Sequence, residues 1–538
     1  MTDPDSDPAD ASRARTFWIA AGALAAAACV LIVVLLLTPH RGHPANSTQS
    51  ATGPQRHPTP VPAPSSAPAA AELTVHSHDG LANLPRSFLG LSTEYWTLPV
   101  DELHIALYER VLSLIHVPGD GPIVLRIGGD SSDHTFYDPT ILHLPRWTFD
   151  LTPQFVARTA TIVRQMRLRV ILDLNLITGT PPLAAAWAQE AERAMPRGSI
   201  IGYEIGNEPD LYSRAFWLLA TEADRFGAHT LPNDITPRGY VRDFGRYARA
   251  LSRVAPHAAL FGPALANPGA DRRWISTLLA GPHPGLRVVS GHRYPYSACA
   301  FPGSRVYPTI DRLLSENATA RMAQTVKPAV RLADQAGLRF RLTELNSITC
   351  GGLPGVSDTF ATALWAPDAV FELARTGAVG INLHAREHAI NDPFTFDARG
   401  LLTRPLLYGL ILFARTLGPD ARLMPTRLHV QGSLHLKAWV VRAGKDMLRV
   451  LLIDKGPRSV RVGLDLPATA AATLERLLAP SPGSRSGVTL EGQSLDHEGN
   501  WVGRPVKEVV VPRAHRYLVT LPRYSAALLN VRMTPGKH

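Results

Sequence analysis

Eight short apolar runs recur between residue 86 and residue 383, and longer stretches with a helical pattern separate them. This alternation is typical of repeated βα units, which build parallel sheets. Eight repeats over about 330 residues predict a closed (β/α)8 barrel. An open doubly wound sheet is the alternative, but no glycine-rich phosphate loop follows the first run. The predicted strands are Ser87–Leu91, Pro122–Ile127, Arg169–Leu174, Ile200–Gly206, Ala258–Gly262, Arg287–Gly291, Arg339–Thr343 and Ala378–Leu383.

Polar side chains stand where most of these runs end. Barrel enzymes assemble their chemistry from the C-terminal ends of several strands, so such residues are candidates for one shared site. Seven of the eight runs end in a polar group: Glu94; Arg126 with Asp130; Asn175; Asn207 with Glu208; His292 with Tyr294; Glu344; and His384.

Glu208 follows the fourth run and Glu344 follows the seventh. Cleavage of a glycosidic bond needs one carboxyl group to protonate the departing oxygen and a second to meet the oxocarbenium-like centre. A retaining enzyme holds these groups about 5 to 5.5 Å apart, whereas an inverting enzyme holds them about 6.5 to 9.5 Å apart. We expect the retaining arrangement, with Arg126 near Glu344 to keep it ionised. Glu204, two residues before Gly206 on one strand face, is expected to lie below the site and pair with an arginine.

Three segments resemble glycoside hydrolase family 79, the heparanase and β-glucuronidase family of retaining clan A enzymes. They are LRIGGDSSD (125–133), IGNEPDLY (205–212) and TELNSITCGGLPGVSDTF (343–360), and the resemblance covers residues 72–538. It implies that Glu208 is the acid/base and Glu344 the nucleophile. The resemblance and the strand-end positions together indicate a set of substrate-binding residues. They are Glu94, Arg126, Asp130, Asn207, His292, Tyr294 and Gly351.

Two features of the chain leave the sugar open. Cys350 stands where the family has the first of the glycines that hold the glucuronate carboxylate, and the segment after the eighth run, residues 382–396, has no tyrosine. Arg386 or His384 could supply a cation there, or Arg386 could be a rim ion-pair partner. The leading prediction is a β-glucuronidase. The alternatives are a retaining glycosidase for a neutral sugar and a catalytically silent polysaccharide-binding surface protein.

Cys299 and Cys350 fall in the loops after the sixth and seventh predicted strands, which are neighbours in a barrel. An oxidising exterior would allow a disulfide between them, and we predict that bond. Two free buried thiols are the alternative. The histidines have no metal-ligand spacing, so no metal or other cofactor is expected.

Beyond residue 415 the pattern changes to alternating apolar and polar residues with turns between them, as in SVRVGLDLP. This pattern predicts an antiparallel β-sandwich over residues 416–538, with Ser525–Met533 as its last strand. Residues 72–85 are expected to add a strand to the sandwich, and residues 86–415 to form the barrel.

The N-terminal part predicts a membrane anchor. Residues 17–37 are 21 uncharged positions, about the length of one membrane-crossing helix. We therefore expect a tail at 1–15, a span at 16–38 and a Pro/Ser/Thr/Ala-rich linker at 39–71. Arg13 and Arg15 precede the span, which favours a cytoplasmic N-terminus and a cell-membrane protein with an extracellular catalytic part. A cleaved signal peptide and a secreted protein are the alternative.

The formal charge of +10 fits an anionic partner or an arginine-rich solvated surface. No basic run with interleaved aromatic residues is present, so nucleic-acid binding is not expected. The expected partners are the membrane and an oligo- or polysaccharide, with uronic-acid-containing polymers among the candidates.

Overall fold

The computed structural model describes residues 69–75, 82–137, 148–212, 236–513 and 516–533, which all belong to one compact unit, residues 57–538. The predicted membrane span and all but the last three residues of the predicted linker lie outside the described residues. None of the helices in the described ranges has the length and apolar character needed to cross a bilayer.

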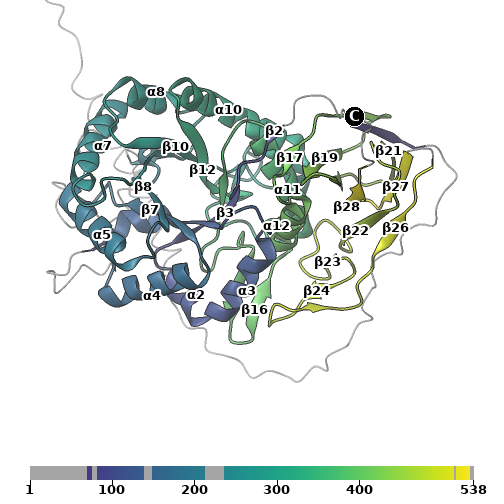
Figure 1. The fold of residues 1–538 in the computed structure, drawn as a ribbon, viewed down its shortest axis with the longest axis horizontal. Helices are drawn as coiled ribbons and strands as arrows, with labels where there is room; N and C mark the ends of the chain where they lie inside the picture. Colours follow the sequence, from purple (N-terminus) through teal and green to yellow (C-terminus); the bar gives the residue numbers. More distant parts are fainter. Residues whose placement is uncertain (1–68, 76–81, 138–147, 213–235, 514–515, 534–538) are drawn as a thin grey trace, which may run out of the picture. The chain divides into compact units, whose positions relative to one another are not determined.

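Eight parallel strands close into a barrel in the order β10-β12-β14-β3-β4-β7-β8-β9 (Figure 1). The predicted (β/α)8 barrel is therefore confirmed. In chain order its strands are β3 (Leu89–Glu94), β4 (Val124–Gly128), β7 (Arg169–Leu174), β8 (Ile200–Ile205), β9 (Leu260–Leu265), β10 (Leu286–Arg293), β12 (Arg339–Leu345) and β14 (Ile381–His384).

Helices follow the strands and cover the outside of the barrel (Figure 1). Three of them begin at a Thr-Pro pair, in which the threonine side chain accepts a hydrogen bond from the third helical N–H and the proline occupies the first helical position. The helices are α2 (Leu98–Leu103), α3 (Ile105–Ile115), α4 (Pro153–Gln165), α5 (Pro181–Ala194), α7 (Pro237–Leu251), α8 (Arg272–Ala280), α9 (Ile310–Leu314), α10 (Ala320–Gln335), α11 (Phe360–Ala374) and α12 (Pro405–Thr416), with 3-10 turns η1 (Gly129–His134), η2 (Pro209–Leu211) and η4 (Glu316–Ala318).

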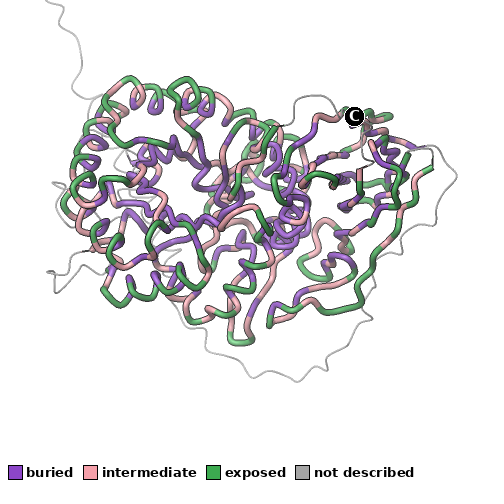
Figure 2. Tube along the Cα trace, in the orientation of Figure 1, coloured by how far each residue is buried: buried purple, intermediate pink, exposed green. Residues whose placement is uncertain are grey.

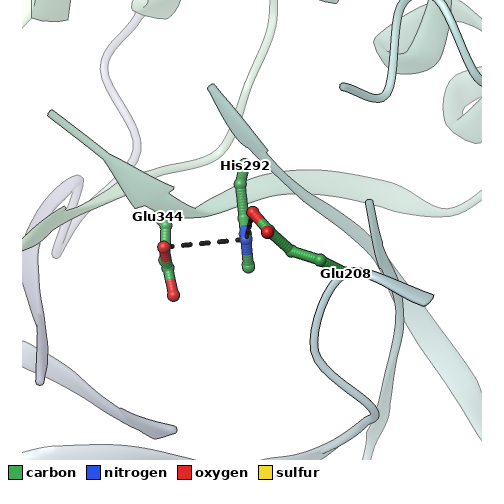
Figure 3. Close-up of side chains that lie close together, drawn as sticks. All are labelled: Glu208, His292 and Glu344. Atoms are coloured by element: carbon green, nitrogen blue, oxygen red, sulfur yellow. Dashed lines mark hydrogen bonds and ion pairs between the residues drawn. The ribbon is translucent and has the colours of Figure 1, made fainter. Parts of the chain in front are cut away.

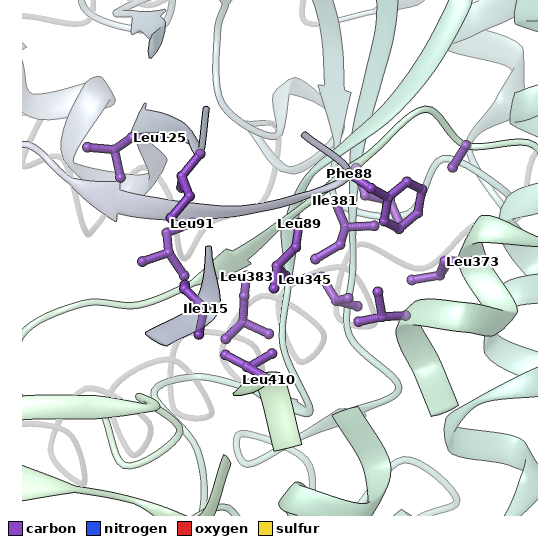
Figure 4. Close-up of a cluster of buried hydrophobic side chains, with 14 of the residues drawn as sticks. Phe88, Leu89, Leu91, Ile115, Leu125, Leu345, Leu373, Ile381, Leu383 and Leu410 are labelled. Carbon is purple, nitrogen blue, oxygen red and sulfur yellow. The ribbon is translucent and has the colours of Figure 1, made fainter. Parts of the chain in front are cut away.

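The largest core lies between the barrel strands and these helices. Figure 4 shows part of it, where side chains of β3, β12 and β14 pack against α3, α11 and α12. Inside the barrel a small apolar cluster contains Val124, Ile171, Phe261 and Val288. Arg126 and Asp173 come two positions after Val124 and Ile171 on the same strand faces. A charged layer therefore lies above this apolar cluster.

Two further sheets pack over a second apolar core, whose residues are purple in the tube of Figure 2. The first has the order β18-β1-β21-β27, and the second the order β2-β17-β19-β20-β28-β22-β23 with β26 beside β22. Their strands are β1 (Ala71–Val75), β2 (Ala82–Asn83), β17 (Arg422–Leu423), β18 (Thr426–Val430), β19 (Leu436–Ala443), β20 (Met447–Asp454), β21 (Val460–Asp465), β22 (Ala472–Leu478), β23 (Thr489–Leu490), β26 (Glu508–Val510), β27 (Arg516–Leu521) and β28 (Ser525–Arg532).

The prediction of a wholly antiparallel sandwich is wrong in one respect. Strand β1 pairs antiparallel with β18 but parallel with β21. It precedes the whole barrel in the chain, so no tight hairpin dictates its direction, and it fills the gap between two strands that run oppositely.

Short two-stranded sheets lie in the loops of the barrel and of the two-sheet part. They are β5 (Thr135–Phe136) with β6 (Phe149–Asp150), β11 (Tyr296–Ser297) with β13 (Ile348–Thr349), β15 (Phe394–Asp397) with β16 (Gly400–Thr403), and β24 (Ser494–Leu495) with β25 (Trp501–Val502). The β11–β13 pair joins the loops that follow β10 and β12, and thereby stiffens the rim of the barrel beside Glu344.

Candidate active site

Glu208 and Glu344 lie on either side of His292 at the C-terminal mouth of the barrel (Figure 3). One oxygen of each carboxylate and one ring nitrogen of His292 all lie within 4.8 Å of one another. Glu344 belongs to β12, the seventh barrel strand, and Glu208 comes three residues after the end of β8, the fourth. The fold thus brings the two predicted acids together.

Glu208 has a left-handed backbone conformation, with φ 48° and ψ 51°. Residues other than glycine rarely adopt it, so the surroundings must hold it in place. Its N–H donates to the carbonyl of Ala264 at 3.0 Å, and Pro209 begins a 3-10 turn directly after it. The carboxylate is therefore aimed by the backbone, and its side chain keeps 15% of its surface exposed.

Arg126 is wholly buried at the base of the site and contacts three carboxylates, one of which is Glu344. Its Nη1 lies 2.5 Å from Glu344 Oε1, its Nε 2.8 Å from Glu204 Oε2, and its Nη2 2.8 Å from Asp173 Oδ2. The planar guanidinium can bind several acceptors in fixed directions, which explains an arginine at this place. The expected pairing of Glu204 with an arginine is present, and Thr343 donates to the other oxygen of Glu204 at 2.8 Å.

Asn207 is oriented by the same guanidinium. Arg126 Nη2 donates to Asn207 Oδ1 at 3.0 Å. Because the amide oxygen is engaged, the amide nitrogen Nδ2 is the group left to face a ligand as a donor.

The second oxygen of Glu344 has three neighbours. Tyr294 donates to Oε2 at 2.9 Å, while His384 Nδ1 and His292 Nδ1 lie at 3.6 and 3.7 Å. Burial alone would raise the pKa of Glu344, but the charges of His292, His384 and Arg126 and the hydrogen bond from Tyr294 hold that pKa well below its usual range. Glu344 is therefore an ionised carboxylate.

His292 links the two acids. Its Nδ1 lies 2.9 Å from Glu208 Oε1, and its Nε2 is buried with no hydrogen-bond partner among the described residues. Burial alone would lower the pKa of His292, but the negative charge of Glu344 and the hydrogen bond to Glu208 outweigh it and raise the pKa above its ordinary value. The imidazole can thus hold a proton between the acids.

Glu94 and His384 continue the network away from Glu208. Glu94 is fully buried, accepts from the N–H of Ser131 at 2.7 Å and lies 3.2 Å from His384 Nε2. His384 Nδ1 lies 2.8 Å from the Tyr294 hydroxyl. Burial alone would lower the pKa of His384, but Glu344 and Glu94 raise it to about 9. Its charge therefore supports the ionised state of Glu344.

Asp130 and Gly351 lie further out, next to Arg386. Arg386 Nη1 is 3.4 Å from Asp130 Oδ2, and both side chains are partly exposed. Gly351 has φ +74°, and a Cβ built on it would be 3.9 Å from Arg386 Nη2. The carbonyl of Gly351 accepts from the N–H groups of Ile390 and Asn391, so this turn is tied to the loop after β14.

Two relatives found by sequence comparison are both beta-glucuronidases. The chain is 23% identical over 466 residues to a beta-glucuronidase of Neurospora crassa, covering 73% of this chain and 80% of the relative. It is 22% identical over 452 residues to a beta-glucuronidase of Aspergillus niger, covering 73% of this chain and 79% of the relative. No protein-family model matches the chain.

Solved structures of glycoside hydrolases share the fold. A 4-O-alpha-L-rhamnosyl-beta-D-glucuronidase from Fusarium oxysporum superposes with a TM-score of 0.68 at 18% identity, and covers 86% of this chain and all of that one. A family 51 arabinofuranosidase from Xanthomonas axonopodis pv. citri superposes with a TM-score of 0.62 at 13% identity and the same coverage. The chain is a glycosidase.

A disulfide crosses the rim of the glycosidase. The structure joins Cys299 to Cys350, with Cα atoms 6.0 Å apart. Cys350 has a positive φ of 59° and precedes Gly351 directly, so the bond holds the start of the turn that follows Glu344.

Asp173 is a residue of the glycosidase site that the sequence reasoning missed, and Asn175 was favoured in its place. Asn175 Oδ1 accepts from the N–H groups of Thr178 and Gly179 at 3.0 and 2.9 Å, so Asn175 closes a turn instead. Asp173 lies on the strand face of Ile171, which points into the barrel. The two-residue alternation of inward-facing positions along this strand is the sequence signal that could have identified Asp173. Burial raises the pKa of Asp173, which limits the negative charge around Arg126.

Glu208, His292 and Glu344 are the group in the described part of the glycosidase whose donor atoms lie close enough together to hold a metal ion. The guanidinium of Arg126 already contacts Glu344 at 2.5 Å and would repel a divalent cation there. The donor set therefore suits proton transfer better than metal binding.

Proposed function

We propose that this glycosidase is a retaining β-glucuronidase of the family 79 type, with Glu344 as nucleophile and Glu208 as acid/base. The observation that carries the proposal is the approach of the two carboxylates, since one oxygen of each lies within 4.8 Å of the other at the barrel mouth. Inversion needs room for a water molecule between the base carboxylate and the anomeric carbon, which requires a separation of about 6.5 Å or more between the two carboxyl groups.

In the first step Glu344 attacks the anomeric carbon, C1. The C1–O bond to the aglycone breaks as the C1–Oε bond forms, and Glu208 gives its proton to the departing oxygen. The charge on Glu344 is held by Arg126 and Tyr294, which supports an ionised nucleophile in the free enzyme. His292 contacts both acids and is placed to keep a proton next to Glu208.

In the second step a water molecule attacks C1 of the glycosyl-enzyme ester. Glu208, which gave up its proton, now accepts one from the water, and the ester bond to Glu344 breaks. The negative charge of Glu344 is absent while the ester exists, so Glu208 no longer faces a second ionised carboxylate at that stage. Glu208 thus acts first as an acid and then as a base, and Glu344 acts first as the nucleophile and then as the leaving group.

The sugar is oriented by polar groups around the mouth. Asn207 Nδ2 donates to the 2-hydroxyl, and Glu94 accepts from hydroxyls remote from C1. The fixed orientation of the Asn207 amide by Arg126 supports the first assignment. The names of the two sequence relatives support a β-glucuronide as substrate.

A panel of p-nitrophenyl β-glycosides tests the proposal. The wild-type protein should release nitrophenol from the glucuronide, and Glu344→Gln should reduce turnover by roughly 10⁴-fold or more while substrate still binds. Full activity in Glu344→Gln, or cleavage of neutral glycosides with none of the glucuronide, would refute the corresponding half of the proposal.

The catalytic part is, in this proposal, held outside the cell by residues 17–37. The support is their length and lack of charge. The full chain should remain in the membrane fraction after carbonate washing, and deletion of residues 1–38 should release an active soluble protein. Full-length protein that is found in the wash would contradict anchoring.

A further inference from the structure

Arg386 lies on the loop after β14 and reaches across the edge of the mouth. One end of its guanidinium is near Asp130, on the turn after β4, and the other is near Gly351, on the turn after β12. Its backbone is fixed, because its N–H donates to Asp392 Oδ1 at 2.7 Å and the next N–H donates to Thr97 Oγ1 at 3.2 Å. The guanidinium therefore stands at a defined place on the rim.

This place corresponds to the C5 side of a bound sugar. Strands β8 and β14 are four steps apart in either direction around the eight-stranded barrel, so they are opposite each other. In a pyranose, C2 flanks C1 on one side, and the ring oxygen with C5 flanks it on the other. If Asn207, after β8, binds the 2-hydroxyl, the C5 substituent points toward β14 and Arg386.

The carboxyl groups around the mouth favour a cation beside a bound uronate. Glu94, Asp130, Glu208 and Glu344 already bring carboxyl groups to this region. A C5 carboxylate would add another and would be repelled unless a positive charge met it. His384 is poorly placed to do so, because its two ring nitrogens are engaged by Tyr294 and Glu94.

Arg386 has more N–H hydrogen-bond donors than its contact with Asp130 uses. Its ion pair with Asp130 is 3.4 Å long, and the two side chains are 33% and 45% exposed, which makes it a weak contact. A guanidinium carries five N–H donors and binds a carboxylate through two of them. Gly351 has no side chain, so the space beside the guanidinium stays open.

We propose that Arg386 is the specificity-determining residue that selects a carboxylate at C5 of the sugar. This inference rests on the proposed function of the Glu208 and Glu344 site, and it names the group by which that site distinguishes a uronide from a neutral sugar.

The test compares p-nitrophenyl β-D-glucuronide with its methyl ester, which has nearly the same shape but no negative charge. Arg386→Gln should lower the acid-to-ester ratio of kcat/KM about 10- to 100-fold, mainly by raising KM for the acid. Arg386→Lys keeps the charge but not the two-pronged geometry and should lie between. Arg399→Gln, an exposed arginine paired with Asp397, is the matched control and should leave the ratio unchanged.

Each outcome tests either the role of Arg386 or the proposed function of the site. An unchanged ratio in Arg386→Gln and Arg386→Lys, with wild-type activity on the acid intact, would overturn the role of Arg386 and leave the glucuronidase standing. A wild-type preference for the ester would also overturn it, although the retaining mechanism would survive. No hydrolysis of either compound by the folded wild type would contradict the proposed function itself.

Discussion

Nη1 of Arg126 lies 2.5 Å from Oε1 of Glu344, and solvent reaches almost none of either side chain. The same guanidinium holds Glu204, Asp173 and Asn207. One buried cation thus stabilises the charge of the proposed nucleophile and orients the amide that is proposed to face the sugar.

Arg126→Met should destabilise the fold by about 3 to 5 kcal/mol, because it leaves buried carboxylates without a partner. The free energy of unfolding from urea denaturation measures this. Arg86→Met removes an ion pair whose partners are mostly exposed, and should change stability by less than about 1 kcal/mol. Equal effects of the two substitutions would show that the Arg126 network contributes no more to the free energy of unfolding than an exposed ion pair does.

The charge on His384 predicts a pH-dependent contribution to stability. Its pKa is about 9 in the folded protein against 6.5 as the ordinary value, so the stabilisation is complete below about pH 6.5 and is lost as the pH rises through 9. At about 1.4 kcal/mol per pKa unit the loss comes to about 3.5 kcal/mol. The stability difference between wild type and His384→Gln should therefore shrink from pH 6 to pH 9.5. Parallel curves over this range would rule out the charged imidazole.

Removal of the disulfide should weaken both the fold and substrate binding. Cys299 and Cys350 are 51 residues apart, and chain entropy assigns such a loop about 4 kcal/mol. Cys299→Ser with Cys350→Ser should lower the free energy of unfolding by about that amount and raise KM, since Gly351 follows directly. The control is Cys29→Ser, which replaces the third cysteine of the chain, within residues 17–37. A double variant as stable as the control would mean that the bond constrains nothing.

Replacement of Glu208 by alanine should have an effect that depends on the leaving group. An aglycone that departs poorly needs a proton, so kcat/KM for such a glucuronide should fall by about 10² to 10⁴-fold. A dinitrophenyl glucuronide departs without that help and should lose far less in the first step. A uniform loss across both substrates would assign Glu208 to binding rather than to proton transfer.

The sequence located the barrel strands well because each is a short apolar run with a polar end. The predicted strand Arg169–Leu174 coincides with β7. Glu208 and Glu344 were found because their chemistry requires a pair at such ends, and the fold supplies their approach.

Other parts required the three-dimensional structure. The direction of β1 depends on its partners β18 and β21, which follow it in the chain by more than 350 residues. Asp173 is hidden inside an apolar run, and its role depends on Arg126 from another strand. His384 was visible as a strand end, but its contact with both Glu94 and Tyr294 follows only from barrel closure.

The anomer released first is the most direct test of the central claim, that Glu208 and Glu344 act by double displacement. Proton NMR of a β-glucuronide during the first minutes of hydrolysis distinguishes the two anomers before they interconvert. Double displacement predicts that β-glucuronic acid appears first and that the α-anomer accumulates later. Initial release of the α-anomer would contradict it.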